Sequence, residues 1–373
     1  MTDAIDWPPA WPRVLDARFG APAAGGYRAT PEAFRVEECL DFAPEGHGEH
    51  LWLWIEKRDL TTAMGARQLA WACGVSPRDV GYAGMKDRSA VTRQWFSVHL
   101  PGREAPADLE AALASASLTL LAQTRHPRKL KRGVHRANRF RLRLTGPALE
   151  DPGFAERWAW LCQHGVANYF GPQRFGPEGR NLHRAVRVLA GGWRKRDDRE
   201  GMLLSAARSF LFNTLLAERV REGNWATPLP GEVVVLDGSA SQFTAEAVDA
   251  SLRERAERLD LHPSGILWGI GGSVAQGEAL ARERDLADHY PALCAGLERA
   301  GVRLGRRPLR LRLEAPRFEA GEGEAWLSFT LARGGFATAV LRELIAHPSL
   351  SFRTPPAGPL QGGEDATSAA VQR

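Results

Sequence analysis

The spacing of apolar residues changes twice along this chain, and that change limits the possible folds more than any other feature. Near both ends, apolar and polar residues alternate with period two, as in half-buried strands, over residues 33–38, 49–57, 309–313 and 325–331. Between them the period is helical, over residues 182–189, 205–220, 245–259 and 285–300. The pattern predicts an α+β fold in which strands from both ends surround a mostly helical insertion.

Changes in composition suggest where these parts meet. The predicted division is an irregular lead-in over residues 1–26, a first part of the core over 27–152, an inserted domain over 153–305, a second part of the core over 306–353, and a tail over 354–373. Three further helices are expected at residues 61–73, 108–121 and 336–345. The tail is rich in Pro, Gly and polar residues, so we expect it to be disordered.

The stretch from Gly81 to Val98 is the leading candidate for chemistry. Asp87 lies between Lys86 and Arg88, and flanking cations favour the ionised form of a carboxyl group. Gly81 and Gly84 suggest a backbone path closed to other residues, and residues 94–98 are typical of a strand. Asp87 is therefore expected on a loop beside a sheet, either as a solvated turn residue or as a catalytic group.

Positive charge is concentrated in one run, residues 125–143, which contains no Asp or Glu. The run contains nine Lys and Arg residues, whereas the formal net charge of the whole chain is only +5. The rest of the chain is therefore slightly acidic, with a net charge of 5 − 9 = −4. Such a cluster forms either a solvated face or a surface that attracts polyanions. The candidates for binding a polyanion are Arg128, Lys129, Lys131, Arg132 and Arg136.

The basic run ends in a strictly alternating segment, residues 138–144. Alternation places Phe140, Leu142 and Leu144 on one face of a strand, and the arginines between them on the other. A Phe in such a position is usually part of a core. An aromatic ring next to cations can also stack on an unpaired base, so Phe140 has two possible roles.

Several classes of protein are disfavoured by what the sequence lacks. No apolar run approaches the length of a membrane span, and the four cysteines form no C-x-x-C pair. The glycine-rich stretch at residues 265–273 lacks a phosphate-binding signature and is predicted to form a turn. We therefore expect a cytoplasmic protein without a metal or a cofactor, although a nucleotide-dependent enzyme that uses residues 265–273 stays a weaker alternative.

The motif around Asp87 resembles the signature of the TruD family of tRNA pseudouridine synthases. Its matching residues are Gly84, Lys86, Asp87, Ala90, Thr92 and Gln94. The resemblance implies that Asp87 is catalytic. Asn138 and Phe140 resemble a second family motif whose residues contact the target uridine. Phe34 resembles a position near the active site. Residues 168–176 resemble a third motif, for which the glycines and aromatic residues favour a packing role.

The resemblance also implies a fold and an activity. The expected fold is a pseudouridine-synthase core, an antiparallel-dominated mixed sheet with flanking helices, interrupted by the inserted domain. The expected activity is isomerisation of uridine 13 in the D arm of tRNA, without a cofactor or an implied protein partner. Lys86 would keep Asp87 ionised or meet a phosphate, while the basic run would bind the RNA backbone. A non-catalytic RNA-binding protein that uses only the basic run is the alternative.

Overall fold

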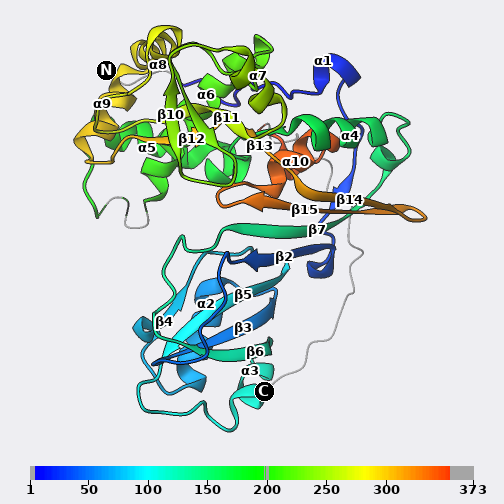
Figure 1. Ribbon diagram of the computed structural model, residues 1–373, viewed down its shortest axis with the longest axis vertical. Coiled ribbons are helices and arrows are strands. Elements are labelled where there is room, and N and C mark those ends of the chain that lie inside the picture. Colours follow the sequence, from blue (N-terminus) through cyan, green and yellow to red (C-terminus); the bar gives the residue numbers. More distant parts are fainter. Residues whose placement is uncertain (1–4, 197, 199–200, 353–373) are drawn as a thin grey trace, which may run out of the picture.

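A nine-stranded sheet forms the centre of the protein (Figure 1). The computed structural model describes residues 5–352 except 197, 199 and 200. Seven strands follow the order β14-β15-β7-β2-β5-β3-β6, while β1 pairs with β7 and β4 pairs with β5. The strands are β1 (Gly26–Tyr27), β2 (Phe34–Cys39), β3 (His50–Arg58), β4 (Val80–Tyr82), β5 (Val91–His99), β6 (Leu118–His126), β7 (Ala137–Thr145), β14 (Glu314–Ala320) and β15 (Glu324–Ala332).

The two ends of the chain meet inside this sheet. β7 and β15 pair antiparallel along their whole length, with Phe140 opposite Phe329, and β2 pairs antiparallel with the other edge of β7. β2 and β5 run parallel, whereas the other pairs recorded for the described strands are antiparallel. The prediction of a mostly antiparallel α+β sheet built from both ends of the chain is confirmed.

Helices cover one face of the sheet in two groups. α4 (Phe154–His164) and α10 (Ala337–Leu344) pack on β7 and β15, where Phe140, Leu142 and Leu144 are buried as the alternation predicted. α2 (Thr62–Ala72) and α3 (Leu109–Ala114) pack with β3 and β5 in a separate cluster. Between the two groups, β2 and β5 carry buried polar residues, among them Glu38 and Gln94. This polar strip positions the candidate site.

The opposite face of the sheet carries a ladder of ion pairs. Arg139, Arg141 and Arg143 pair with Glu37, Glu319 and Glu324 at 2.9, 3.1 and 3.4 Å. Arg136 pairs with Glu314 at 3.2 Å. These cations are paired with carboxylates on an exposed face, and the role of Arg136 in binding a polyanion stays a prediction. The acidic residues that neutralise them come from distant strands. Exposed pairs of this kind contribute only about 0–1 kcal/mol each.

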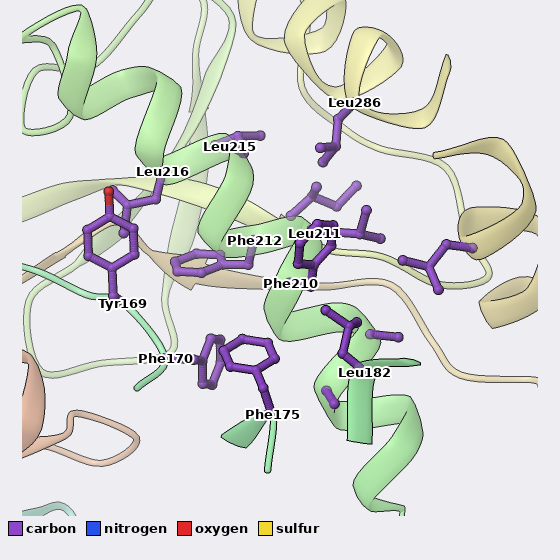
Figure 2. Packing of buried hydrophobic residues seen from close by; sticks show 14 of the residues in the cluster. Tyr169, Phe170, Phe175, Leu182, Phe210, Leu211, Phe212, Leu215, Leu216 and Leu286 are labelled. Atoms are coloured by element: carbon purple, nitrogen blue, oxygen red, sulfur yellow. The ribbon is translucent and has the colours of Figure 1, made fainter. Parts of the chain in front are cut away.

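The inserted part has its own core, built around the long helix α6 (Met202–Arg221). Figure 2 shows Phe210, Phe212 and Leu216 of α6 packed with the aromatic residues Phe170 and Phe175. Trp11, from the lead-in, joins the same cluster, so the lead-in is anchored there. The remaining helices are α5 (Arg180–Ala190), α7 (Ala250–Glu257), α8 (Gly277–His289) and α9 (Pro291–Arg299), and one short helix in the lead-in is α1 (Asp16–Phe19).

A four-stranded antiparallel sheet that the sequence did not predict spans the insertion and the residues just after the predicted boundary at 305. Its order is β10-β9-β11-β12, and a two-stranded ladder of β13 and β8 lies beside it. These strands are β8 (Val166–Ala167), β9 (Glu232–Leu236), β10 (Gln242–Ala245), β11 (Leu261–Leu267), β12 (Gly305–Pro308) and β13 (Arg310–Leu311). The description of the insertion as mostly helical therefore omitted a second sheet.

Several local predictions were wrong. The helix expected over residues 285–300 is divided into α8, which ends at His289, and α9, which begins at Pro291. The helix expected over residues 108–121 ends at Ala114, and β6 begins at Leu118, after Ser117 adopts a φ of 59° that interrupts the helix. Residues 265–267, predicted as part of a turn, lie in β11. A Cβ on Gly265 would come within 2.8 Å of Phe212, so this glycine permits close packing.

The predicted tail, residues 354–373, lies outside the described residues. Within the described chain, none of the helices is both long and apolar enough to span a membrane.

Candidate active site

Asp87 lies on the loop between β4 and β5, on the polar strip of the sheet. Its side chain is 38% exposed and its Oδ2 lies 3.5 Å from a guanidinium nitrogen of Arg28. The Arg28 guanidinium stacks over Phe34, 4.0 Å from the ring centroid. Arg28 has a φ of 60°, a conformation uncommon for residues other than glycine and concentrated at functional sites. A cation that the sequence analysis missed thus holds the carboxylate in place.

The two cations next to Asp87 in sequence have other partners. Lys86 is buried, and its Nζ donates to Glu38 Oε2 at 2.6 Å. Arg88 points to Asp59, with a shortest nitrogen–oxygen distance of 3.6 Å. The expectation that Lys86 would serve Asp87 directly or meet a phosphate is therefore corrected, because the Lys86 ammonium is committed to a buried carboxylate.

Buried side chains from two elements, α2 and β5, fix the backbone of this loop. Thr62, at the start of α2, accepts from the Lys86 N–H at 2.9 Å and donates to Gln94 Oε1 at 2.9 Å. The Gln94 amide nitrogen in turn donates to the Gly84 carbonyl at 3.1 Å. Because both side chains are fully buried, the loop is held by a satisfied polar network.

Lys57, on β3, reaches Asp87 from beneath. Its ammonium donates to the Asp87 carbonyl at 2.9 Å and to the Leu60 carbonyl. Burial lowers the pKa of Lys57 to about 8, although the negative charge of Asp87 opposes this shift. A buried ammonium without a carboxylate bonded to it is costly, so its direct contact with the Asp87 backbone suggests a role at the site.

Gly81 and Gly84 serve close packing. Neither has a φ in the left-handed region, so the predicted need for an unusual backbone path is wrong. A Cβ on Gly81 would lie 2.4 Å from the Leu130 carbonyl oxygen, and one on Gly84 would lie 2.9 Å from the His135 ring. The segment after β6 therefore packs directly against the Asp87 loop.

His135 is the titratable group packed against this loop. Burial, together with the neighbouring Lys86 and Arg333 charges, lowers the pKa of His135 to about 4. The unfolded chain takes up a proton near pH 6.5, whereas the folded chain does not until about pH 4, so the free energy of unfolding falls as pH drops through this window.

Between pH 7 and pH 5, the free energy of unfolding should fall in both His135→Asn and the natural protein. We expect the fall to be about 2 kcal/mol smaller in His135→Asn. Burial raises the pKa of Glu38, which contributes the opposite pH slope, but Glu38 is present in both proteins. Urea unfolding at the two pH values measures the difference. Parallel pH dependences would contradict the prediction.

A large cavity borders the loop. Its volume is about 1260 Å³, and Arg28 and Met85 line it close to Asp87. Residues of the third motif line it farther along, including Phe170 and Arg174, and Phe336 contributes from the segment before α10. The aromatic stretch from Asn168 to Gly176 thus has the predicted packing role and also forms part of a cavity wall.

The predicted site residues Phe34, Asn138 and Phe140 lie on the neighbouring strands β2 and β7. Phe34 and Phe140 are only 1% and 6% exposed, and their rings meet in a T-shaped contact with centroids 6.3 Å apart. Asn138 lies opposite Glu38 in the sheet, and its Oδ1 is buried without a hydrogen-bond partner in the described structure. In this arrangement Phe140 supports Phe34, which supports Arg28.

The basic loop, defined here as residues 127–134, lies beside the Asp87 loop. The Gly133 N–H donates to the Ala83 carbonyl at 2.7 Å, and Arg132 donates to the Tyr82 hydroxyl at 3.0 Å. Lys129 donates to the Arg78 carbonyl. Arg128 and Lys131 are exposed and form no ion pair with the described residues. Positive charge therefore borders the loop that carries Asp87.

The fold and the site define a class, an α+β protein whose sheet carries an acidic centre beside a cavity and a cationic loop. A family model described as tRNA pseudouridine synthase D (TruD) matches residues 20–195 and 196–344. The chain therefore belongs to the tRNA pseudouridine synthase D family.

Individual relatives agree with this assignment. A tRNA pseudouridine synthase D of Chromohalobacter salexigens is 61% identical over 94% of this chain and 100% of its own. One of Methylococcus capsulatus is 47% identical over 86% of this chain and 91% of its own. The fold is similar to a crystal structure of the putative tRNA pseudouridine synthase D from Methanosarcina mazei, with a TM-score of 0.62 and 21% identity, covering 87% of this chain and 94% of that one.

Proposed function

We propose that this chain isomerises a uridine of tRNA to pseudouridine, with Asp87 as the catalytic group. The observation that carries the proposal is the half-exposed Asp87 carboxylate, held by Arg28 next to a cavity. The reaction breaks the bond between C1′ of the ribose and N1 of the uracil and forms a bond between C1′ and C5. N1 gains a proton and C5 loses one, so the reaction consumes no oxidant or reductant.

The residues around Asp87 would divide the work. Arg28 orients the carboxylate toward the ribose. Asn138 has a buried, unsatisfied amide oxygen that would accept a hydrogen bond from the uracil once the groups that cover it move. Phe34 and Phe140 form the floor beneath Arg28. Base stacking on Phe140, as the sequence suggested, would require the groups that cover its ring to move.

The target nucleotide must leave its stack before it reaches Asp87, at a cost of a few kcal/mol. Contacts with phosphate groups can offset this cost. The basic loop is the first candidate, because Arg128, Lys129, Lys131 and Arg132 border the Asp87 loop and carry no acidic partner among the described residues. The proposed target is uridine 13 in the D arm, and the proposed place of action is the cytoplasm.

Incubation with an unmodified tRNA transcript, without any cofactor, tests the proposal. Carbodiimide labelling followed by reverse transcription would then map pseudouridine. We expect a stop at position 13. If the protein binds tRNA and leaves every uridine unchanged, the alternative of a non-catalytic RNA-binding protein gains the support that the proposal loses.

Lys57→Met tests how the Asp87 loop is held. Because Lys57 bonds to the Asp87 carbonyl and not to its carboxylate, we expect the rate of the chemical step to fall about 10- to 100-fold, from misplacement of the carboxylate. The affinity for tRNA should stay within about twofold of the natural protein, because the Lys57 side chain is buried. Single-turnover rates and binding titrations measure the two effects. A loss of affinity with an unchanged rate would contradict this role.

A further inference from the structure

Two arginines without acidic partners among the described residues lie around Phe170, a residue that lines the cavity. Arg174 lines the cavity and donates to the Ser205 hydroxyl at 3.0 Å. Arg307 is buried and bonds to Asn168 and to the Gly334 carbonyl. Neither forms an ion pair with an Asp or Glu of the described chain. The buried Arg219 and Arg306 differ, since they pair with Glu232 and Glu283, whereas the buried Arg310 bonds to His262 and to backbone carbonyls.

The two guanidinium groups also repel each other. Both lie against the same two rings, with Arg174 5.3 Å and Arg307 4.1 Å from the centroid of Phe170, and 5.8 and 5.5 Å from that of Phe336. Burial lowers the pKa of both groups, and the positive charge of Arg174 lowers that of Arg307 further, to about 9. Aromatic faces attract cations but leave their hydrogen-bond donors unused. Arg307 already donates to Asn168 and Gly334, whereas the only hydrogen bond of the Arg174 guanidinium among the described residues is to Ser205. An anion would satisfy the remaining Arg174 donors and relieve the repulsion.

Cavity size indicates how far the ligand extends. At about 1260 Å³ the cavity exceeds the roughly 300–1,000 Å³ of a small-molecule pocket, and it runs from Arg28 to Arg174. A cavity of this volume has room for more than a single nucleotide. Phe336, which is only partly buried, offers a ring beside Arg174. The space therefore suits RNA on one side of the target uridine.

We infer that Arg174 binds a backbone phosphate of a nucleotide neighbouring the target uridine, so that the substrate is held at both ends of the cavity. This inference rests on the proposed function. Arg174 is the member of the pair that can reach the RNA, because it lines the cavity, whereas Arg307 lies behind Phe170 and supplies charge. The phosphate accepts hydrogen bonds from the planar guanidinium fork, as arginine–phosphate contacts commonly do.

Arg174→Met separates this role from a structural one. Removing an unpaired, desolvated cation should leave the melting temperature of the free protein unchanged or raise it. The affinity for tRNA should fall about tenfold or more, and the slope of log affinity against log salt should decrease by about one phosphate contact. Arg253→Met, an exposed residue of α7 with the same change in charge, should alter neither quantity. A lower melting temperature together with an unchanged salt slope would overturn the inference.

Chemical substitution of the RNA locates the phosphate. A tRNA assembled from synthetic pieces carries a neutral methylphosphonate at one position at a time, from three nucleotides before the target to three after it. At one position we expect the methylphosphonate to lower the affinity of the natural protein about tenfold. At the same position it should leave the affinity of Arg174→Met unchanged. If no position shows this coupling, the inference is wrong.

Two controls complete the design. Titration with inorganic phosphate should show no Arg174-dependent binding below millimolar concentration, and tight binding would instead assign the site to a free anion. The natural protein is assayed for pseudouridine in the same experiment. If the natural protein forms no pseudouridine, the proposed function is wrong. If it is active but no methylphosphonate position is coupled to Arg174→Met, only the inference about Arg174 is wrong.

Discussion

Asp87→Asn is expected to lower the rate of pseudouridine formation at least about a thousandfold, while leaving the affinity for tRNA almost intact. Asparagine has nearly the same shape as aspartate but carries no charge, so it can neither attack nor remove a proton in the way a carboxylate does. The lost ion pair with Arg28 is partly exposed, so we expect little loss of stability. Single-turnover rates, filter binding and thermal unfolding measure the three quantities.

Asp59→Asn is the matched control. Asp59 follows β3 and pairs, at 3.6 Å, with Arg88 of the loop that carries Asp87. The Asp59 side chain is 49% exposed. Its φ of 48° is a conformation that asparagine tolerates well. The control makes the same chemical change close to Asp87, and we expect it to stay within a few fold of the natural rate. Equal losses in the two variants would mean that charge near the loop matters and the identity of Asp87 does not.

Lys86→Met should have the largest effect on stability. It leaves Glu38 buried without its cation, and breaking a buried ion pair in this way typically costs about 3–5 kcal/mol. Burial already raises the pKa of Glu38, and the Lys86 charge opposes that rise. In the variant, protonation of Glu38 in the folded state should therefore recover part of the lost stability as pH falls.

A double-mutant cycle checks the origin of this effect. Glu38→Gln combined with Lys86→Met removes both charges, so the double variant should be more stable than Lys86→Met alone. Urea unfolding of the four proteins at pH 7 gives the coupling free energy. Additive losses would show that the two side chains act independently, in conflict with their 2.6 Å contact.

The sequence predicted those parts of the structure whose cause is local. Alternation along residues 138–144 correctly placed Phe140, Leu142 and Leu144 on one face of a strand, and Asp87 lies on a loop before a strand as expected. The second sheet was not predictable by periodicity, because β11 contains Pro263 and Gly265 and does not alternate. Its glycine is explained only by the position of Phe212.

The partners of Asp87 could not be predicted for the same reason. Arg28 and Lys57 are far from Asp87 in sequence, and only sheet formation brings them near the loop: Arg28 directly follows β1, which pairs with β7, and Lys57 lies on β3, which pairs with β5. Sequence adjacency instead suggested Lys86, whose charge turns to Glu38 because the backbone places consecutive side chains on different sides. The positive φ of Arg28 is visible only in the folded chain.

Release of the C5 hydrogen tests the central claim most directly. Because isomerisation replaces the C5–H bond of uracil by a C5–C1′ bond, tRNA labelled with tritium at C5 of uridine must lose tritium to water. The account predicts cofactor-independent release equivalent to a single uridine per tRNA from the natural protein, and release at least about a thousandfold slower from Asp87→Asn. A folded natural protein that binds this tRNA and releases no tritium would contradict the account.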